Sequence, residues 1–270
     1  MKKVFLTLVL LATTFAAQAQ NNYHDALKAY VQACPSALSS MDKTMGDALK
    51  LLNEELITDY KGMTSEQLVN KYMKEQYVND MIDKMLLPVV QKNATIAEVN
   101  ELTAAMSTQA GRTYQEHQKQ VNINSGEMER IAMELAQAII EGNTPKPVTV
   151  KSGCPQSYVN LYYQFFKESG LNSVVGQMGN LFGDQKDTPE AQKILKYFED
   201  NMQTIYLNMS YGIMTTDDLK FGMKVYKTEA WKHMMKATAE VVQNPQSTGM
   251  ALVMAYISWL QTQGLKLKTD

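Results

Sequence analysis

Two segments of this chain, residues 95–121 and 215–241, carry the same helix-start signal 120 positions apart. Each opens with a threonine that is followed three positions later by an acidic residue, and apolar side chains then recur at steps of three and four. In such a capping box, the threonine oxygen and the carboxylate satisfy amide donors that the first helical turn leaves free. The pattern predicts one long amphipathic helix in each segment.

The same offset brings other positions into register without a gap, which indicates an internal duplication. The matched pairs include Cys34 with Cys154, Tyr77 with Tyr197, Asp80 with Asp200, Thr95 with Thr215, and Glu98 with Asp218. Residues 143–153 contain two prolines, no helical period and a final glycine, which is typical of a linker. We therefore predict two copies of one unit, 20–142 and 154–270, on either side of this linker.

Helical periodicity runs through both copies. The further helices that it predicts are Pro35–Thr58, Ser65–Gln91 with a kink at Pro88, Glu127–Glu141, Pro155–Phe182, Pro189–Tyr211 and Gly249–Gln263. No segment shows the strict alternation of a β-strand or an Asn-Gly hairpin turn. We expect an all-α fold, built as a tandem duplication of an antiparallel helical unit with about four to five helices per copy.

The first 19 residues are typical of a cleavable export signal. Lys2 and Lys3 make a basic start, the apolar run Val4–Leu11 is too short to span a bilayer, and small residues follow as far as Ala19. We expect cleavage between Ala19 and Gln20 and a periplasmic or secreted product. No later apolar stretch reaches membrane length, so we expect no transmembrane helix.

The charge balance is nearly even, with 26 basic and 28 acidic residues. A chain without a block rich in lysine or arginine binds nucleic acid poorly. We therefore expect no nucleic-acid partner.

The chain has two cysteines, Cys34 and Cys154. In an oxidising compartment, an isolated pair is more often a disulfide than two free thiols, and this is our prediction. Interchain pairing and two buried thiols are the alternatives. An internal bridge would close a loop of more than a hundred residues, for which the chain-entropy model gives roughly 4 to 5 kcal/mol.

Residues 95–102 and 106–112, Thr-Ile-Ala-Glu-Val-Asn-Glu-Leu and Met-Ser-Thr-Gln-Ala-Gly-Arg, resemble the signature of an exported bacterial family called domain of unknown function 2059. That signature is a capped helix with an acidic pair, an aromatic position, a small-residue turn and a basic residue. The second copy is similar, with Tyr226 at the aromatic position, where the first has Met106, and with Trp231 replacing the glycine. The resemblance implies a helical, exported protein and supplies no reaction, because the family has no established activity.

No sequence motif predicts a reaction. The three histidines, His24, His117 and His233, lie outside the His-Glu-x-x-His and Glu-x-x-His patterns of metal sites, and Gly-x-Ser-x-Gly and Cys-x-x-Cys are absent. His117 lies on the apolar stripe of its segment, where we expect a hydrogen-bonded core residue rather than a metal ligand. We expect no metal and no cofactor.

The one candidate for acid–base chemistry is a pair of matched carboxylates. Asp80 and Asp200 each stand three residues after a matched tyrosine, Tyr77 and Tyr197. If a local two-fold axis relates the copies, the two acids could approach and shift each other's pKa. The favoured interpretation is that both acids lie on a solvated helix face.

The lack of catalytic motifs, beside duplicated helices rich in methionine and tyrosine, favours a non-catalytic binding or interaction module of the cell envelope. Its ligand would be a protein or a small molecule held between the copies. Two alternatives stay open: a metal-independent envelope hydrolase that uses Asp80 and Asp200, and a chaperone-like binder of exported proteins. No feature of the sequence indicates an oligomeric state.

Overall fold

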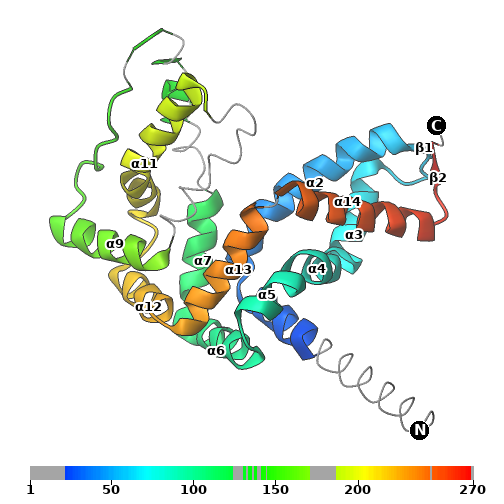
Figure 1. The fold of residues 1–270 in the computed structure, drawn as a ribbon, viewed down its shortest axis with the longest axis horizontal. Coiled ribbons are helices and arrows are strands. Elements are labelled where there is room, and N and C mark those ends of the chain that lie inside the picture. Colours follow the sequence, from blue (N-terminus) through cyan, green and yellow to red (C-terminus); the bar gives the residue numbers. More distant parts are fainter. Residues whose placement is uncertain are drawn as a thin grey trace, which may run out of the picture.

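The computed structural model describes residues 22–123, 130–131, 133–135, 137–138, 141–143, 145–170, 187–243 and 245–268. These residues are mostly helical, with one short two-stranded sheet (Figure 1). The all-α prediction is therefore confirmed. The predicted export signal lies outside the described residues, and among the residues that are described no helix is long and apolar enough to cross a membrane.

After helical residues 22–33, the first half of the chain continues with one long helix and a series of shorter ones. They are α2 (Pro35–Leu56), α3 (Ser65–Glu75), α4 (Tyr77–Met81), the π-helical turn η1 (Ile82–Leu86), α5 (Leu87–Asn93), α6 (Ile96–Ser107) and α7 (Gln109–Ile123). The predicted helix 65–91 is thus broken at Gln76, and it winds into η1 just before Pro88. Proline has no amide donor, and the wider turn absorbs the resulting kink.

Among the described residues, the second half has fewer helices than the first. They are α9 (Gln156–Ser169), α11 (Pro189–Ser210), α12 (Thr216–Tyr226), α13 (Glu229–Gln243) and α14 (Pro245–Thr262). The sheet pairs β1 (Ile57–Asp59), which follows α2, with β2 (Lys266–Leu267) near the end of the chain, in antiparallel orientation.

Both predicted capping boxes form. The hydroxyl of Thr95 accepts the amide of Glu98 at 3.3 Å, and the hydroxyl of Thr215 accepts the amide of Asp218 at 3.2 Å. In return, each carboxylate accepts the backbone amide of its own threonine at 2.7 Å. The starts of α6 and α12 are therefore closed by the same reciprocal bonds.

Neither box opens one long helix, so that part of the prediction is wrong. Each segment breaks at a second threonine: the hydroxyl of Thr108 accepts the amide of Gly111 at 3.0 Å, and that of Thr228 accepts the amide of Trp231 at 3.2 Å. A threonine hydroxyl competes with the backbone for amide donors, and here it starts a new helix. The apolar stripe continues across the break because both helices face the same core.

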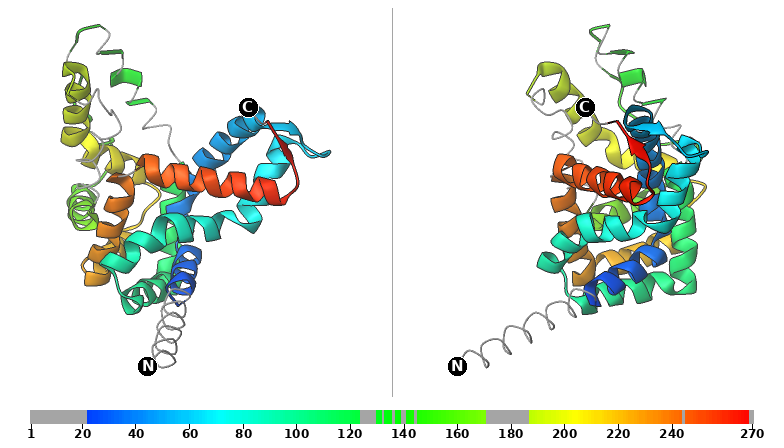
Figure 2. Two further views of the ribbon diagram at one scale, coloured as in Figure 1. Left: turned by 45° about the vertical axis from the view of Figure 1, so that its right-hand side comes forward. Right: turned by 90° about the vertical axis from the view of Figure 1, so that its right-hand side faces the viewer.

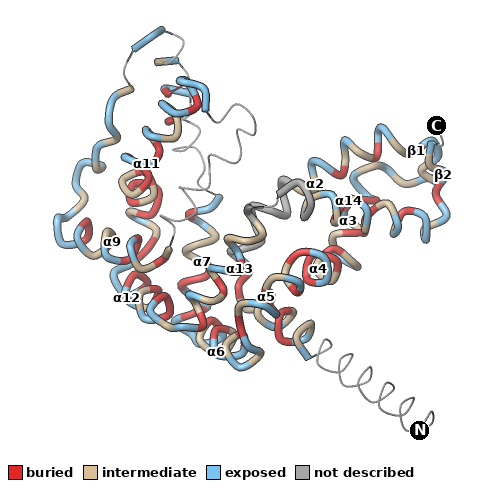
Figure 3. Tube along the Cα trace, in the orientation of Figure 1, coloured by how far each residue is buried: buried red, intermediate tan, exposed pale blue. Residues whose placement is uncertain are grey.

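The two halves of the chain pack through one another. Helix α13 of the second half lies on α5 and α6 of the first, α12 lies on α7, and α14 returns to α4 and η1 (Figures 1 and 2). The buried apolar side chains of both halves form one continuous cluster, which follows the inner faces of these helices (Figure 3). The predicted copies are therefore not separately packed units.

The C-terminal helix closes on the first half through a buried polar contact. Asn53 on α2 is fully buried, accepts the hydroxyl of Tyr256 on α14 at 2.8 Å, and donates to the hydroxyl of Ser65 at 3.2 Å. Tyr256 and Trp259 pack against Tyr72, with ring centroids 4.8 and 5.3 Å away. Because the buried amide has partners, its desolvation is compensated.

One tyrosine bond recurs in the two halves. The hydroxyl of Tyr23 donates to the carbonyl of Ala94 at 3.2 Å, and that of Tyr158 donates to the carbonyl of Met214 at 3.0 Å. Both carbonyls directly precede a capping threonine. The two tyrosines are 135 positions apart, whereas the two threonines are 120 positions apart. The ungapped offset of 120 therefore does not align the tyrosines near the start of the copies. The duplication itself stays a prediction.

We predict that Gly111→Ala destabilises the protein. A Cβ at this position would lie 2.5 Å from the backbone oxygens of Ala105 and Met106, so α6 and α7 would have to move apart. Overpacking of this kind costs about 1 to 3 kcal/mol. Gly249→Ala is the matched control, because no atom lies within 4 Å of its added Cβ. It should stabilise α14 by about 0.5 to 1 kcal/mol. Urea unfolding of both variants measures the difference, and equal free energies of unfolding would refute this account.

Candidate functional site

The matched carboxylates have different surroundings and share no hydrogen-bond partner. Asp80 is buried on α4, where it accepts the hydroxyl of Tyr72 at 2.8 Å and the side-chain amide of Gln76 at 3.0 Å. Asp200 lies on the exposed side of α11, and its carboxylate is 3.4 Å from the ammonium of Lys196. The structure does not bring the two acids together, and the solvated-face interpretation fits Asp200 alone.

The two matched tyrosines also differ. Tyr77 is 1% exposed and packs edge-on against Tyr72, with ring centroids 6.2 Å apart. Tyr197 is half-buried, and its hydroxyl donates to the carbonyl of Lys146 at 3.1 Å. Burial raises the pKa of Tyr197, which keeps the hydroxyl protonated and able to donate.

Cys34 and Cys154 are free thiols in the structure, so the predicted bridge is not formed there. Cys34 is buried where helix 22–33 meets α2, and burial raises the pKa of its thiol to about 12, against a hydrogen bond from Tyr30 that lowers it. Cys154 is half-buried before α9, and burial raises its pKa too. Both cysteines precede a proline at the start of a helix, but Cys34 directly follows helix 22–33, whereas Cys154 follows the non-helical linker. Neither thiol has the lowered pKa of a reactive cysteine.

Two histidines join the halves of the chain by reciprocal contacts with the capping carboxylates. Nδ1 of His117 on α7 lies 2.8 Å from Oδ2 of Asp218, and Nδ1 of His233 on α13 lies 2.8 Å from Oε1 of Glu98. Each histidine belongs to the helix that follows one capping box, and it binds the carboxylate of the other box. This agrees with the hydrogen-bonded role predicted for His117.

The capping bonds hold both carboxylates in their charged form. At Glu98, hydrogen bonds from the backbone and side chain of Thr95, and then from His233, hold the pKa below its ordinary value. At Asp218, burial opposes ionisation, but the hydrogen bonds from Thr215 and His117 outweigh it and the pKa is again lowered. A charged carboxylate accepts from every donor around it, so Nδ1 of each imidazole donates.

Aromatic side chains fill the junction beside these contacts. The hydroxyls of Tyr114 on α7 and Tyr226 on α12 are hydrogen-bonded to each other, and the ring of Phe165 packs against both. Burial raises the pKa of Tyr114, and it raises that of Tyr226 to about 12, so both stay neutral. The expected ligand site between the copies is therefore occupied by side chains at this junction.

The three histidines all lie beside carboxylates. The hydrogen bonds of His117 and His233 described above go to carboxylates that already cap helices, and His24 lies 3.7 and 3.6 Å from Asp25 and Asp83. Within the described part of the chain, no group of three or more histidine, cysteine or acidic side chains could hold a metal ion.

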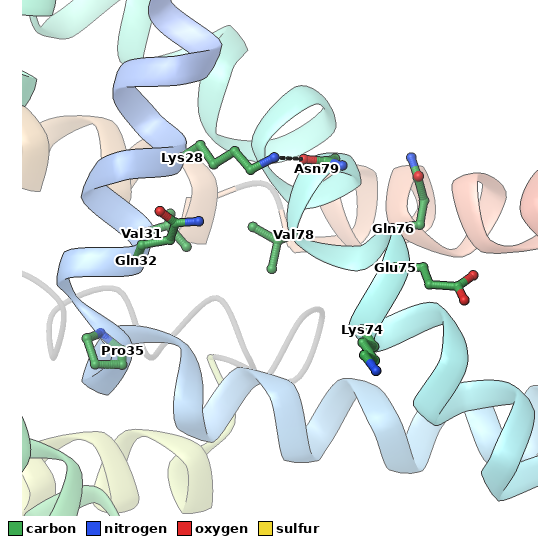
Figure 4. Close-up of a pocket in the computed structure, with 9 residues that line it drawn as sticks. All are labelled: Lys28, Val31, Gln32, Pro35, Lys74, Glu75, Gln76, Val78 and Asn79. Carbon is green, nitrogen blue, oxygen red and sulfur yellow. Dashed lines mark hydrogen bonds between the residues drawn. The ribbon is translucent and has the colours of Figure 1, made fainter.

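Two clefts lie on either side of helix 22–33. The first, of about 360 Å³, opens between that helix, α2, α3 and α4 (Figure 4). Lys28 and Asn79 face each other across it, joined by a hydrogen bond of 3.3 Å. Val31 and Val78 supply apolar walls, and Lys74 adds a second amine.

The second cleft, of about 550 Å³, lies between helix 22–33, α6 and α7. Ala29, Ala33 and Met106 form its apolar wall, and Arg112, Gln115 and Glu116 supply polar groups. Gln115 is 6% exposed and donates to the sulfur of Met106 at 3.2 Å. A few polar groups on an apolar wall are typical of small-molecule sites. Sequence patterns did not single out this cleft, although Arg112 lies in the segment that resembles a family signature.

We predict that Asp218→Asn destabilises the protein by about 1 to 3 kcal/mol, because an amide replaces a charged acceptor that serves both Thr215 and His117. Asp217→Asn is the matched control on the same helix, because the side chain of Asp217 is 91% exposed. This substitution should lower the free energy of unfolding by less than about 0.5 kcal/mol. Because the pKa of Asp218 is lowered by folding, its contribution is full near neutral pH and is lost as the pH falls from about 5 to 2.

Urea unfolding at several pH values measures this effect. The wild type and Asp218→Asn should converge in stability at low pH. A double-mutant cycle with His117→Ala should give a favourable coupling energy at neutral pH. If Asp217→Asn and Asp218→Asn lowered the free energy of unfolding equally, the role assigned to the carboxylate of Asp218 would be contradicted.

Comparison with known proteins finds no counterpart for this arrangement. No family model matches the chain, and no curated protein or solved structure matches it either. The resemblance to domain of unknown function 2059 therefore stays a prediction.

Proposed function

We propose that this chain is an exported, non-catalytic binding module of the cell envelope, and that its ligand lies in the cleft between helix 22–33, α6 and α7. The observation that carries the proposal is the composition of this cleft, where an apolar wall meets the guanidinium of Arg112 and the amide of Gln115. With Glu116 also in the lining, these groups suit a small molecule with an apolar body and a polar group that both accepts and donates hydrogen bonds.

The chemistry of the histidines supports a non-catalytic role. A general base must lie within reach of the substrate, and neither His117 nor His233 lines the proposed cleft. The alternative of an envelope hydrolase that uses Asp80 and Asp200 lacks the paired geometry that it requires, because each acid has partners of its own. Binding is therefore the better supported class.

A chaperone-like role is the second candidate. Met250 and Met254 lie one turn apart on α14 and are 61% and 54% exposed. Exposed methionines are flexible and polarizable, and they suit contacts with varied apolar partners. Suppression of client aggregation by the purified protein, lost when both are changed to serine, is the result that would favour this role over the cleft.

We also infer that the halves are diverged copies of one unit. The inference is supported by the repeated capping boxes, the repeated break at a threonine, and the repeated bond from a tyrosine to the carbonyl before each box.

If the chain is exported, cleavage of its leader should reduce the mass of the mature protein. Expressed with its own leader, the chain should begin at Gln20, and intact-mass spectrometry without reductant should show the loss of two hydrogens if Cys34 and Cys154 are bridged. Alkylation under denaturing conditions is the control, because free thiols take the label. A chain that keeps Met1 would contradict export, and two alkylated cysteines would contradict the bridge.

We predict that Ala29→Phe blocks the cleft. Ala29 is exposed on helix 22–33, so a larger side chain there fills the cleft without entering the core. Ala104→Phe, at another exposed alanine, on α6 and outside the cleft lining, is the matched control. The probe is 8-anilinonaphthalene-1-sulfonate, an apolar fluorescent anion, together with native mass spectrometry for any retained ligand. Ala29→Phe should weaken binding about tenfold, or by about 1.4 kcal/mol. The same affinity in both variants would rule out this cleft.

A further inference from the structure

The linker between the halves does not cross open solvent but lies along α11. Residues 146–153, which we call the strap, run beside this helix in the views of the fold (Figures 1 and 2). Val148 and Val150 are half-buried and pack against the core, whereas Thr149 between them is exposed. The strap therefore has the alternation of an extended peptide laid on a surface.

Side chains of α11 hold the strap by its backbone. Asn201 accepts the amide of Val148 at 2.7 Å. Asn208 accepts the amide of Lys151 and donates to the carbonyl of Thr149, both at 2.9 Å. Asn208 thus satisfies one donor and one acceptor on the same edge of the extended chain, as a neighbouring β-strand would.

Two tyrosines bind the ends of the strap in the same way. The hydroxyl of Tyr197 donates to the carbonyl of Lys146 at 3.1 Å, and that of Tyr211, directly after α11, donates to the carbonyl of Gly153 at 2.8 Å. We call Tyr197, Asn201, Asn208 and Tyr211 the asparagine face.

The spacing of the face matches an extended chain. Asn201 and Asn208 are seven residues apart, two helical turns or about 10.5 Å along the axis. They bind the amides of Val148 and Lys151, which are three extended residues or about 10 Å apart. The distance between the two asparagines therefore matches the distance between the two backbone amides that they bind.

This face requires a polar backbone opposite it. Asn201 and Asn208 are 7% and 3% exposed, and an unpaired buried amide costs about 1 to 3 kcal/mol. The bonds to Val148, Thr149 and Lys151 described above use main-chain atoms, so they do not depend on side-chain identity at these positions. Selectivity comes from the two half-buried valines, and from the ammonium of Lys151, which donates to the carbonyl of Asn208 at 2.9 Å in the last turn of α11.

We propose that the asparagine face is a peptide-binding site that the strap occupies in cis. The partner is an extended segment of another polypeptide, with β-branched apolar residues at two alternate positions and a basic residue directly after the second. Such a segment makes the same backbone bonds when it displaces the strap. This inference does not rest on the cleft beside helix 22–33, which involves other helices.

The strap competes with any free peptide for the asparagine face. A tethered segment competes at an effective concentration of about millimolar, so the wild type binds a free peptide weakly. Val148→Ser with Val150→Ser weakens the strap and leaves the asparagine face unchanged. This strap-weakened variant should bind the fluorescent peptide Lys-Pro-Val-Thr-Val-Lys-Ser-Gly at least about tenfold more tightly than the wild type does.

The peptide itself provides the sharpest control. N-methylation of its second lysine, which corresponds to Lys151, removes the donor that Asn208 accepts and should abolish binding to the strap-weakened variant. N-methylation of its threonine, which corresponds to Thr149, removes an amide that makes none of the bonds described above and should cost far less. Adding Asn201→Ala should weaken binding at least about tenfold, whereas Glu199→Ala, at an exposed position on the same helix, should not.

Hydrogen exchange in the wild-type protein tests the displacement without any substitution. Saturating peptide should speed exchange at the amides of Val148 and Lys151, because the strap leaves the asparagine face. The proposal is overturned if the strap-weakened variant does not bind the peptide, if both N-methylated peptides bind alike, or if peptide binding to the wild type leaves these two amides protected.

Discussion

The carboxylates of Glu98 and Asp218 each close the first turn of their own helix and bind a histidine of the other half. This double use links local and tertiary structure, because the group that starts α6 also positions α13, and the group that starts α12 also positions α7. The aromatic cluster around Tyr114 and Tyr226 then fills the space between these helices. The remaining helices extend this junction outward.

Local signals in the sequence were sufficient for the fold class and for the capping boxes. Thr95 and Thr215 act as predicted because a helix start depends on residues within one turn. The breaks at Thr108 and Thr228 escaped prediction because the apolar stripe runs through them, and the hydroxyl bonds that interrupt the helix leave no trace in its period. The partners of Asp80 and Asp200 escaped it as well. A register of 120 positions does not say which helix lies beside each acid.

The candidate sites were less predictable than the fold for the same reason. The cleft around Met106 and Arg112 is formed by helix 22–33, α6 and α7, and no periodicity shows that these three meet. The asparagine face depends on the spacing of Asn201 and Asn208. This spacing predicts no site by itself, because the sequence does not show that the strap lies beside α11. His117 was the exception, because a histidine on an apolar stripe needs a hydrogen-bond partner wherever it is buried.

Two capping carboxylates thus hold the imidazoles of His117 and His233 across the halves. The most direct measurement is the nitrogen chemical shifts of both rings by NMR, at a pH where the imidazoles are neutral. Each ring should carry its proton on Nδ1, donated to the carboxylate. A proton on Nε2 in both neutral rings would contradict these hydrogen bonds, because Nδ1 would then have no hydrogen to donate to the carboxylate.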